Sequence, residues 1–153
     1  MFSKACEYGI KAVLYIAIQS QSGKRIGIKG IATGINSPEA FTGKILQQLV
    51  KSEIIYSVKG PSGGFEIGKN GLQKIKLCHI VSAIDGDDIY NGCGLGLKNC
   101  NELKPCPVHD KFKAIRDDLK KMLETTTLKE LAEGLESGLT FFKAMIDLCQ
   151  FLV

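Results

Sequence analysis

The residues between positions 93 and 109 are the part of the sequence best suited to chemistry. Cys93 is followed by six residues and Cys100, then by five residues and Cys106, and His109 comes three positions later. Thiolates and imidazoles are ligands of iron-sulfur clusters and of zinc. Because these four side chains fall within seventeen residues, they can converge on one inorganic centre. We therefore predict a metal site here.

Two alternatives to an iron-sulfur cluster stay open at this point. Three cysteines and a histidine can form a tetrahedral structural zinc site, and the loop can also be free of metal. Zinc fingers that bind RNA stack bases on aromatic side chains, whereas the residues between these cysteines are Gly, Leu, Lys, Asn, Glu and Pro. An RNA-binding zinc finger is therefore disfavoured.

The remaining cysteines, Cys6, Cys78 and Cys149, stand among apolar residues, where a single cysteine is usually a small buried side chain. The first apolar stretch is interrupted by Glu7 and Lys11 and is not followed by a cleavage site. We therefore expect a cytoplasmic protein without a disulfide framework.

Catalysis is not indicated by the reactive side chains. The sequence has no Cys-x-x-Cys pair and only two histidines, of which His79 is expected to be a plain surface residue. A thiol redox enzyme would lack a partner thiol at the usual spacing and would have little acid-base machinery. We therefore expect a protein that is not an enzyme.

Composition is that of an ordinary globular chain. Of the 153 residues, 44% are hydrophobic and 24% are charged, which excludes collagen-like and disordered proteins. The longest uninterrupted apolar run, Ala12 to Ile18, is far shorter than the roughly 20 residues that span a bilayer. No membrane association is expected.

Charge is distributed unevenly along the chain. Residues 1–77 hold 11 Lys or Arg and 4 Asp or Glu, whereas residues 78–153 hold 9 and 12. Phosphate neutralisation supplies most of the sequence-independent affinity for nucleic acid. The basic half of the chain is therefore the half expected to meet a polyanion.

Three helices are predicted in the basic half. Apolar residues recur every three or four positions over residues 5–18 and again over 28–35. Asn36, Ser37 and Pro38 then form a helix start, with Ser37 as the N-cap and Pro38 at the first helical position. This third helix is expected to end near Ser52.

On a helical wheel the third helix has one apolar and one polar half. The apolar half is formed by Phe41, Thr42, Ile45, Leu46, Leu49 and Val50. The other half contains lysines, glutamines and small residues without an acidic side chain, a set that can approach a duplex, meet phosphates and hydrogen-bond base edges. The candidate DNA contacts on and before this helix are Ser37, Ala40, Gly43, Lys44, Gln47, Gln48 and Lys51.

A β-hairpin is predicted next. The runs Ile54–Val58 and Phe65–Ile67 are rich in β-formers, and a glycine-rich loop joins them. Three helices followed by a hairpin make a winged helix-turn-helix, whose third helix enters the major groove while the wing touches phosphate. In the wing, Lys59, Ser62 and Gly63 are the candidate DNA contacts.

Residues 1 to about 133 resemble the Rrf-type winged-helix transcription regulators, the bacterial family that includes IscR and NsrR. The resemblance rests on four segments: Glu7–Val13, Ile28–Ala32, Lys44–Val50 and, most specifically, the wing motif Lys59-Gly60-Pro61-Ser62-Gly63-Gly64-Phe65. It implies a homodimer that binds a pseudo-palindromic operator in double-stranded DNA.

The resemblance also implies that the three-cysteine loop holds an iron-sulfur cluster, of the 2Fe-2S or 4Fe-4S type, since cluster-binding members carry three cysteines here. The six-residue spacer between Cys93 and Cys100 leaves the cluster type open. His109 matches the position of a histidine ligand in IscR-like members, and we favour it as the fourth ligand. Glu7 is the alternative, because other members supply a carboxylate from this helix of the opposite subunit.

The second half of the chain is expected to carry the dimer. A short helix is predicted over residues 77–84, and Pro107 is expected to open the longest helix of the chain. The heptad-like seam of this helix is Val108, Phe112, Ile115, Leu119 and Met122, with ion pairs among Lys113, Asp117 and Lys121 on its outer face. Periodicity alone fits packing within one chain equally well.

A capping box at Thr127–Glu130 predicts one more short helix, and residues 135–153 are expected to form an apolar helical extension. We thus predict a mainly α protein with three parts. Residues 1–77 form the winged helix-turn-helix domain, and residues 78–134 form the cluster loop and dimerisation helix. The predicted function of the protein is transcription regulation, as a repressor that senses redox state, nitric oxide or iron-sulfur status. The alternative is a winged-helix DNA-binding protein that is metal-free or stabilised by zinc.

Overall fold

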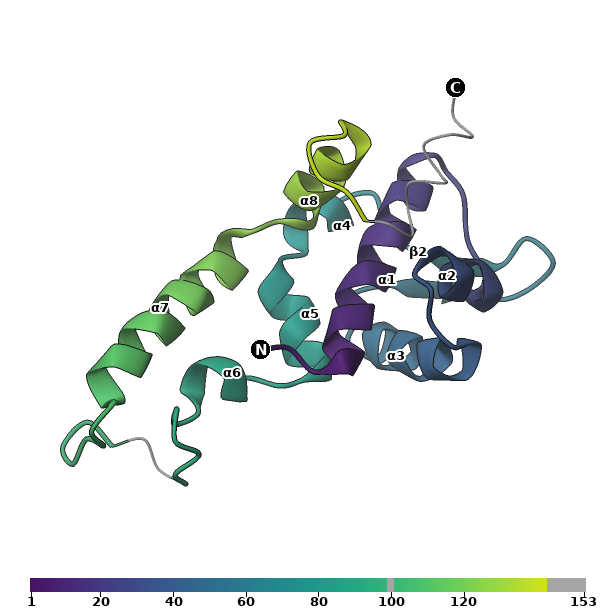
Figure 1. Ribbon diagram of the computed structural model, residues 1–153. Coiled ribbons are helices and arrows are strands. Elements are labelled where there is room, and N and C mark those ends of the chain that lie inside the picture. Colours follow the sequence, from purple (N-terminus) through teal and green to yellow (C-terminus); the bar gives the residue numbers. More distant parts are fainter. Residues whose placement is uncertain (99–100, 143–153) are drawn as a thin grey trace.

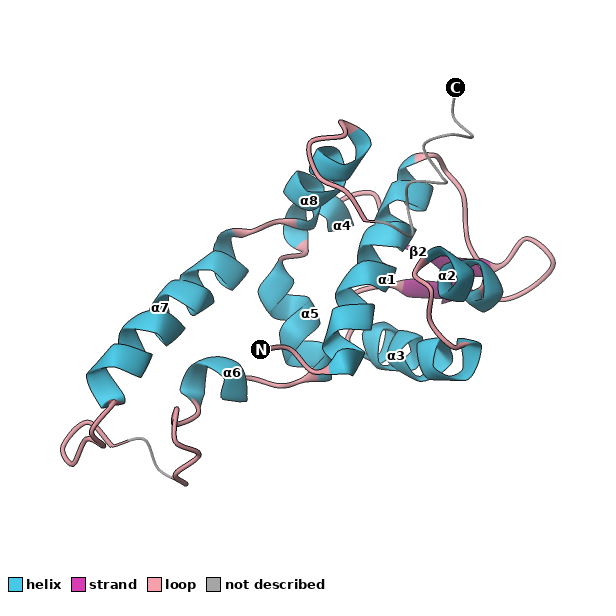
Figure 2. Cartoon of the chain, in the orientation of Figure 1, coloured by secondary structure: helices cyan, strands magenta, loops and turns pink. Residues whose placement is uncertain are grey.

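The computed structural model describes residues 1–98 and 101–142. These residues are mainly helical, with one two-stranded sheet (Figure 2), as predicted. The elements in chain order are α1 (Lys4–Gln21), α2 (Ile28–Gly34), α3 (Glu39–Lys51), β1 (Tyr56–Val58), β2 (Gly64–Glu66), α4 (Gly71–Lys74), α5 (Leu77–Ile84), α6 (Asp88–Asn91), α7 (His109–Thr125) and α8 (Leu128–Glu136).

Helix α1 is the centre of the core. It contacts α2, α3, α5 and α8 (Figure 1), and every residue from Ala12 to Ala17 is buried. A helix covered on several sides must be apolar over most of its circumference, which explains why its apolar run is continuous. Its start is capped by Ser3, whose hydroxyl accepts a hydrogen bond from the backbone N–H of Cys6 at 3.0 Å.

The turn between α2 and α3 differs in detail from the prediction. Pro38, and not Ser37, is the N-cap of α3, and the cap makes no side-chain hydrogen bond. Asn36 turns the chain with a φ of 51°, and the backbone N–H of Ser37 then donates to the carbonyl of Ala32 at 2.9 Å. This bond ties Ser37 to the end of α2 and keeps its side chain from capping α3.

The hairpin is shorter than predicted. Strands β1 and β2 pair antiparallel, with Tyr56 opposite Glu66. Ile54 and Ile55 precede the strand because both are buried in the core beneath it. Ile26 adds an unpredicted bridge to Phe65, through N···O distances of 2.8 and 3.2 Å.

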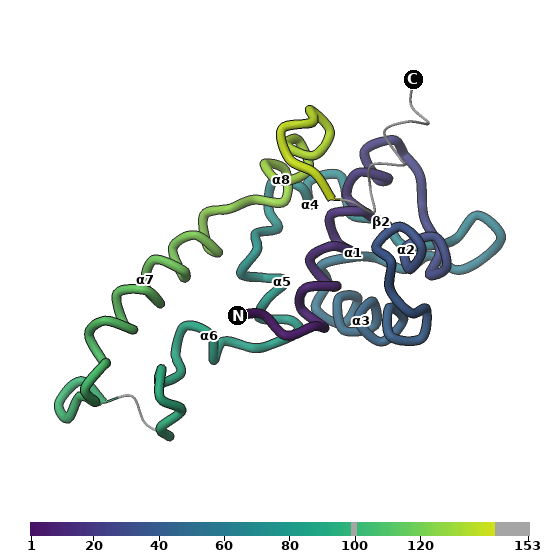
Figure 3. Tube along the Cα trace, viewed as in Figure 1, coloured from purple at the N-terminus to yellow at the C-terminus, as the bar shows by residue number. Residues whose placement is uncertain are grey.

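The tip of the hairpin requires glycine. A Cβ atom at Gly63 would lie 2.3 Å from the carbonyl oxygen of Val58, and Gly64 has a φ of +141°. Neither position tolerates a side chain without a change in the backbone. The loop from Lys59 to Gly63 therefore keeps a shape that the glycines determine, and it projects from the body of the molecule (Figure 3).

The second half of the chain follows the predicted order with two corrections. Helix α5 has the expected bounds, but α7 begins at His109, two residues after Pro107. Helix α7 has 17 residues and α1 has 18, so α7 is not the longest helix. The one-turn helices α4 and α6 were not predicted, because four residues are too few to show a period.

Helix α7 lies at the edge of the molecule, with α5 between it and α1 (Figures 1 and 3). A second apolar cluster joins these three helices through the fully buried side chains of Cys6, Val81 and Leu123. A displacement of the C-terminal end of α7, where Leu123 lies, is therefore transmitted by direct contact to α5 and α1.

Helix α8 begins as predicted, because the Thr127 hydroxyl accepts a hydrogen bond from the N–H of Glu130 at 3.2 Å. It ends at Glu136, and residues 137–142 are not helical. Phe142 packs against the core, whereas Phe141 is exposed. The rest of the predicted apolar extension lies outside the described residues.

Candidate nucleic-acid interface and cysteine loop

Helix α3 has one buried and one exposed face, divided as the helical wheel predicts. Thr42, Ile45, Leu46 and Leu49 are buried, and Phe41 and Val50 are half-buried. The predicted DNA contacts with exposed side chains are Ala40, Lys44, Gln47, Gln48 and Lys51. Two cations and two amides therefore stand on one solvent-facing surface, where they can reach phosphates and base edges.

Two other candidates, Ser37 and Gly43, are half-buried and thus less exposed than the residues above. The hydroxyl oxygen of Ser37 is enclosed and has no hydrogen-bond partner among the described residues, so Ser37 is the less accessible of the two. A Cβ atom at Gly43 would meet nothing closer than the Ile28 Cδ1 atom at 4.0 Å. Packing within the chain therefore does not require glycine at this position.

Replacing Gly43 by alanine is expected to have opposite effects on folding and on binding. The helix should become more stable by about 0.5–1 kcal/mol, because alanine loses less conformational entropy than glycine. DNA affinity should fall, because a methyl group would stand between the helix and the duplex. Urea denaturation and fluorescence anisotropy with a labelled duplex measure the two effects. Unchanged or improved DNA binding by Gly43→Ala would show that Gly43 does not face the duplex.

The wing places its predicted contacts at the surface. Lys59 and Ser62 are exposed, and Gly63 is half-buried in the turn. An ion pair from Arg25 Nε to Glu66 Oε2, at 2.8 Å, braces the wing against the segment before α2. Sequence reasoning missed this pair, because two residues 41 positions apart show no periodic relation.

The cysteine loop connects α6 to α7 at the end of the molecule (Figure 1). Cys93 and Cys106 are both half-buried and not in a disulfide. The Cys93 sulfur accepts a hydrogen bond from the N–H of Leu95 at 3.4 Å. The backbone N–H groups of Leu95 and Leu97, and then the Cys106 side chain, hold the pKa of the Cys93 thiol below its ordinary value.

The four predicted ligands are only partly tested by this geometry. Cys93 and Cys106 lie near enough to each other that the Cys106 side chain helps to lower the pKa of the Cys93 thiol, and Cys100 lies outside the described residues. His109 is 6% exposed and opens α7, and its N–H donates to the carbonyl of Cys106 at 3.0 Å. Residues 1–98 and 101–142 contain no group of three His, Cys, Asp or Glu side chains close enough to hold a metal ion.

Helix α7 holds both ends of the loop. The Arg116 guanidinium donates a hydrogen bond to the carbonyl of Gly92, next to Cys93. Lys113 forms an ion pair with Glu102 of the loop. The ring of Phe112 lies so close to Gly94 that a Cβ atom there would be 2.5 Å from it. The conformation of the loop is therefore coupled to the first half of α7.

The contact from Lys113 to the loop corrects a prediction. Ion pairs were expected along α7 among Lys113, Asp117 and Lys121, but within the described part of the chain none of these three residues pairs with another. Lys113 instead meets Glu102. The side chains of Lys113 and Glu102 are 43% and 71% exposed, so this surface pair contributes little to stability.

The alternative ligand Glu7 is half-buried in the first turn of α1, where it forms an ion pair with Lys4 at 2.7 Å. A hydrogen bond from Lys4 is the main reason that the pKa of Glu7 is below its ordinary value. Figure 1 places this end of α1 apart from the cysteine loop of the same chain. Within one chain, Glu7 therefore does not reach the loop.

The surroundings of Cys6, Cys78 and His79 are those of residues with a structural role. Cys6 is fully buried, and desolvation raises the pKa of its thiol to about 12. Cys78 is half-buried against the same apolar cluster, whereas Cys149 lies outside the described residues. His79 is exposed, and its Nδ1 atom accepts a hydrogen bond from the backbone N–H of Lys76 at 3.1 Å at the start of α5.

Among the described residues, no helix is long and apolar enough to cross a membrane.

The sequence matches one family along most of its length. The profile of Rrf2, described as iron-dependent transcriptional regulator, matches residues 2–134. A helix-turn-helix transcriptional regulator of Aquifex aeolicus is 30% identical over 133 residues, which are 86% of this chain and 90% of that protein. The regulator IscR of Pectobacterium atrosepticum is 27% identical over 129 residues, with 84% and 77% coverage.

Solved structures share the fold. CymR, the global cysteine regulator of B. subtilis, superposes with a TM-score of 0.73 at 20% identity and covers 88% of this chain and 98% of its own. IscR of T. potens superposes with a TM-score of 0.71 at 17% identity and covers 95% of both chains. At these identities the likeness establishes the winged-helix architecture.

Proposed function

Because the chain belongs to the Rrf2 family of transcriptional regulators, we propose that it is a repressor whose operator binding is controlled by an iron-sulfur cluster. The members that it matches are transcriptional regulators and not enzymes, in agreement with the absence of catalytic motifs from the sequence. The observation that carries the proposal is the arrangement of two features. An exposed Lys and Gln face on α3 is followed in the chain by the glycine-shaped wing, and a cysteine loop precedes α7.

The DNA-binding half of the proposal is residues 1–77. Helix α3 enters the major groove with Lys44, Gln47 and Gln48 toward base edges, while Lys51 and Lys59 neutralise phosphates. The glycine backbone at the wing tip, which no side chain covers, lets Ser62 and its neighbours approach the sugar-phosphate backbone closely.

The sensing half of the proposal is the loop. Cys93, Cys100 and Cys106 would hold the cluster, with His109 as the fourth ligand or Glu7 of the partner subunit in its place. When bound, a 2Fe-2S or 4Fe-4S cluster supplies a centre that responds to oxidants, nitric oxide or iron supply. The N–H groups near Cys93 favour its thiolate, the form that binds metal. These contacts also suit zinc, which makes a zinc-stabilised regulator without sensing the second candidate.

The proposal assigns dimerisation to α7. Phe112, Ile115 and Met122 have exposed fractions of 39%, 63% and 43%, and they recur along one side of the helix. Three large apolar side chains in one exposed row are typical of a helix that pairs with another copy of itself. The Cys6–Val81–Leu123 cluster then couples the spacing of the two α7 helices to the two DNA-reading halves, as a two-state switch requires.

Selection from a randomised duplex pool tests the function as a whole. We expect the purified protein to enrich an inverted repeat whose half-site centres lie about 34 Å apart, one turn of B-DNA. Footprinting on the enriched duplex should protect both half-sites. A pool that shows no enrichment over several rounds, with either the metal-loaded or the metal-free protein, would contradict the assignment as a sequence-specific regulator.

Replacing Ile115 by glutamate is expected to convert the dimer to a monomer. The substitution places a charge in the centre of the proposed α7 seam, where burial of an unpaired carboxylate is strongly unfavourable. Size-exclusion chromatography with light scattering measures the mass. Ala114→Glu, at an exposed position beside the seam, is the matched control and should stay dimeric. A dimer that survives Ile115→Glu would place the interface elsewhere.

A further inference from the structure

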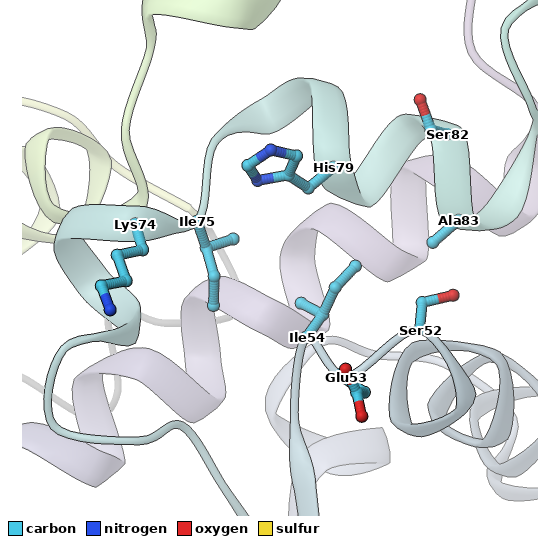
Figure 4. A pocket seen from close by; sticks show the side chains of 8 residues that line it. All are labelled: Ser52, Glu53, Ile54, Lys74, Ile75, His79, Ser82 and Ala83. Carbon is cyan, nitrogen blue, oxygen red and sulfur yellow. The ribbon is translucent and has the colours of Figure 1, made fainter.

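A cavity that is open to solvent, with a volume of about 490 Å³, lies between the end of α3 and the helices α4 and α5. Its volume is within the range of small-molecule sites, roughly 300–1,000 Å³. None of its lining residues is a proposed DNA contact or belongs to the cysteine loop, so neither of the proposed activities uses it. Figure 4 shows the side chains that line it: Ser52, Glu53, Ile54, Lys74, Ile75, His79, Ser82 and Ala83.

The charges of this cavity are arranged as a separated pair. Lys74 and Glu53 come from different sides of the cavity, with Ile54 and Ile75 between them (Figure 4). Both side chains are exposed, and within the described residues neither takes part in an ion pair. One cationic and one anionic group therefore face the same space without neutralising each other.

His79 is the third polar group of the cavity, and its Nε2 atom can bond a ligand. The Nδ1 atom of His79 accepts the N–H of Lys76, so a neutral His79 carries its hydrogen on Nε2, the nitrogen left to donate. By contrast, the hydroxyl of Ser82 is already bonded to Asp87 and Tyr90. The polar contacts available to a ligand are therefore those of Lys74, Glu53, His79 and the hydroxyl of Ser52.

The apolar part of the lining is small. Ile54, Ile75 and Ala83 contribute it, and Ile54 is 5% exposed and thus fixed by the core. A complementary molecule carries an anionic group for Lys74, a cationic group for Glu53 and a short apolar portion between or beside them. We propose that this cavity binds a free aliphatic amino acid, a zwitterion with a carboxylate, an ammonium group and an apolar side chain.

Occupancy of the cavity has a direct route to the DNA-reading helix. Ser52 is the C-cap of α3, whereas His79 and Ala83 belong to α5, which packs against α7. A ligand that touches both helices favours one relative position of them over another. It is therefore expected to change operator affinity. This consequence rests on the proposed function, whereas the binding of the amino acid does not.

Isothermal titration calorimetry of the full chain with L-alanine, L-valine and L-leucine tests the site. We expect saturable binding of at least one of them, and no binding of isovalerate or isoamylamine, which carry one charge each. Lys74→Gln and Glu53→Gln should each weaken the binding about tenfold, since a charge-assisted contact is lost. Lys69→Gln removes an exposed charge outside the cavity and should bind as the wild type does.

Absence of saturable binding of all three amino acids, or equal binding by Lys74→Gln, Glu53→Gln and the wild type, would overturn the proposal. Anisotropy with the selected operator, with and without saturating ligand, then tests the effector role. The wild-type Kd should shift several-fold and that of Lys74→Gln should not. An unchanged wild-type Kd would contradict the effector role, whereas failure of the proposed function is recognised separately, as absence of operator binding without ligand.

Discussion

Replacing Gln47 by alanine is expected to lower the affinity for the selected operator about tenfold to a hundredfold. Gln47 is exposed on the outer face of α3, and a glutamine amide can make two hydrogen bonds to an adenine edge, a pair worth about 1–3 kcal/mol. Because the lost contacts are made to a base, affinity for unrelated duplexes should change little. Fluorescence anisotropy with operator and scrambled duplexes, at one stated salt concentration, measures both.

Two variants separate base reading from phosphate binding. Gln73→Ala removes the same side chain from an exposed position on α4 and should bind as the wild type does. Lys51→Ala should weaken operator and scrambled duplexes alike and reduce the salt dependence of log K by about one unit. Equal losses on both duplexes for Gln47→Ala would mean that Gln47 does not read bases.

Replacing Cys93 by alanine is expected to abolish the visible absorbance of anaerobically prepared protein and to alter operator affinity. A cluster needs its thiolate ligands, and the Cys93 sulfur accepts a hydrogen bond from the backbone N–H of Leu95. The fold should be preserved, because Cys93 lies on an irregular loop outside both apolar clusters. Absorption spectra, far-ultraviolet circular dichroism and operator anisotropy measure the three expectations.

Cys78→Ala is the matched control for this experiment. It removes a thiol that packs against the apolar cluster of α1, α5 and α7, so it should keep the absorbance. If Cys93→Ala loses the cluster but binds the operator with unaltered affinity, the loop does not control DNA binding. If it keeps iron and colour, Cys93 is not a ligand.

The fold was predictable from the sequence where a period of three or four residues extends over several turns. Helix α1 and the two faces of α3 follow from the spacing of apolar residues, because burial of one face decides the structure there. The bounds of α3 were less accurate, since the bond from Ser37 to Ala32 depends on a turn conformation that periodicity does not contain.

The candidate site was predictable as a set of residue types and not as a geometry. Spacing alone indicates that Cys93 and Cys106 can meet, but Arg116 and Lys113 of α7 also hold the loop, through Gly92 and Glu102. No motif in the sequence links these α7 residues to the loop. The cavity between α3, α4 and α5 had no signal in the sequence, because its lining comes from three segments without a shared motif.

The exposure of the α7 seam bears on one alternative that the sequence leaves open. A row of apolar residues every three or four positions fits packing within the chain or against a second copy. Leu123 is fully buried by its own chain, whereas Ile115 remains 63% exposed. Phe112, Ile115 and Met122 therefore form an apolar surface that the described residues do not cover.

The most direct test of cluster binding is a chemical analysis of protein purified without oxygen. It measures iron, acid-labile sulfide and zinc together with the visible spectrum. We expect a coloured protein with iron and sulfide in comparable amounts and with little zinc. A colourless protein that takes up no iron after reconstitution would contradict the cluster. Stoichiometric zinc in that protein would leave a winged-helix regulator with a structural metal.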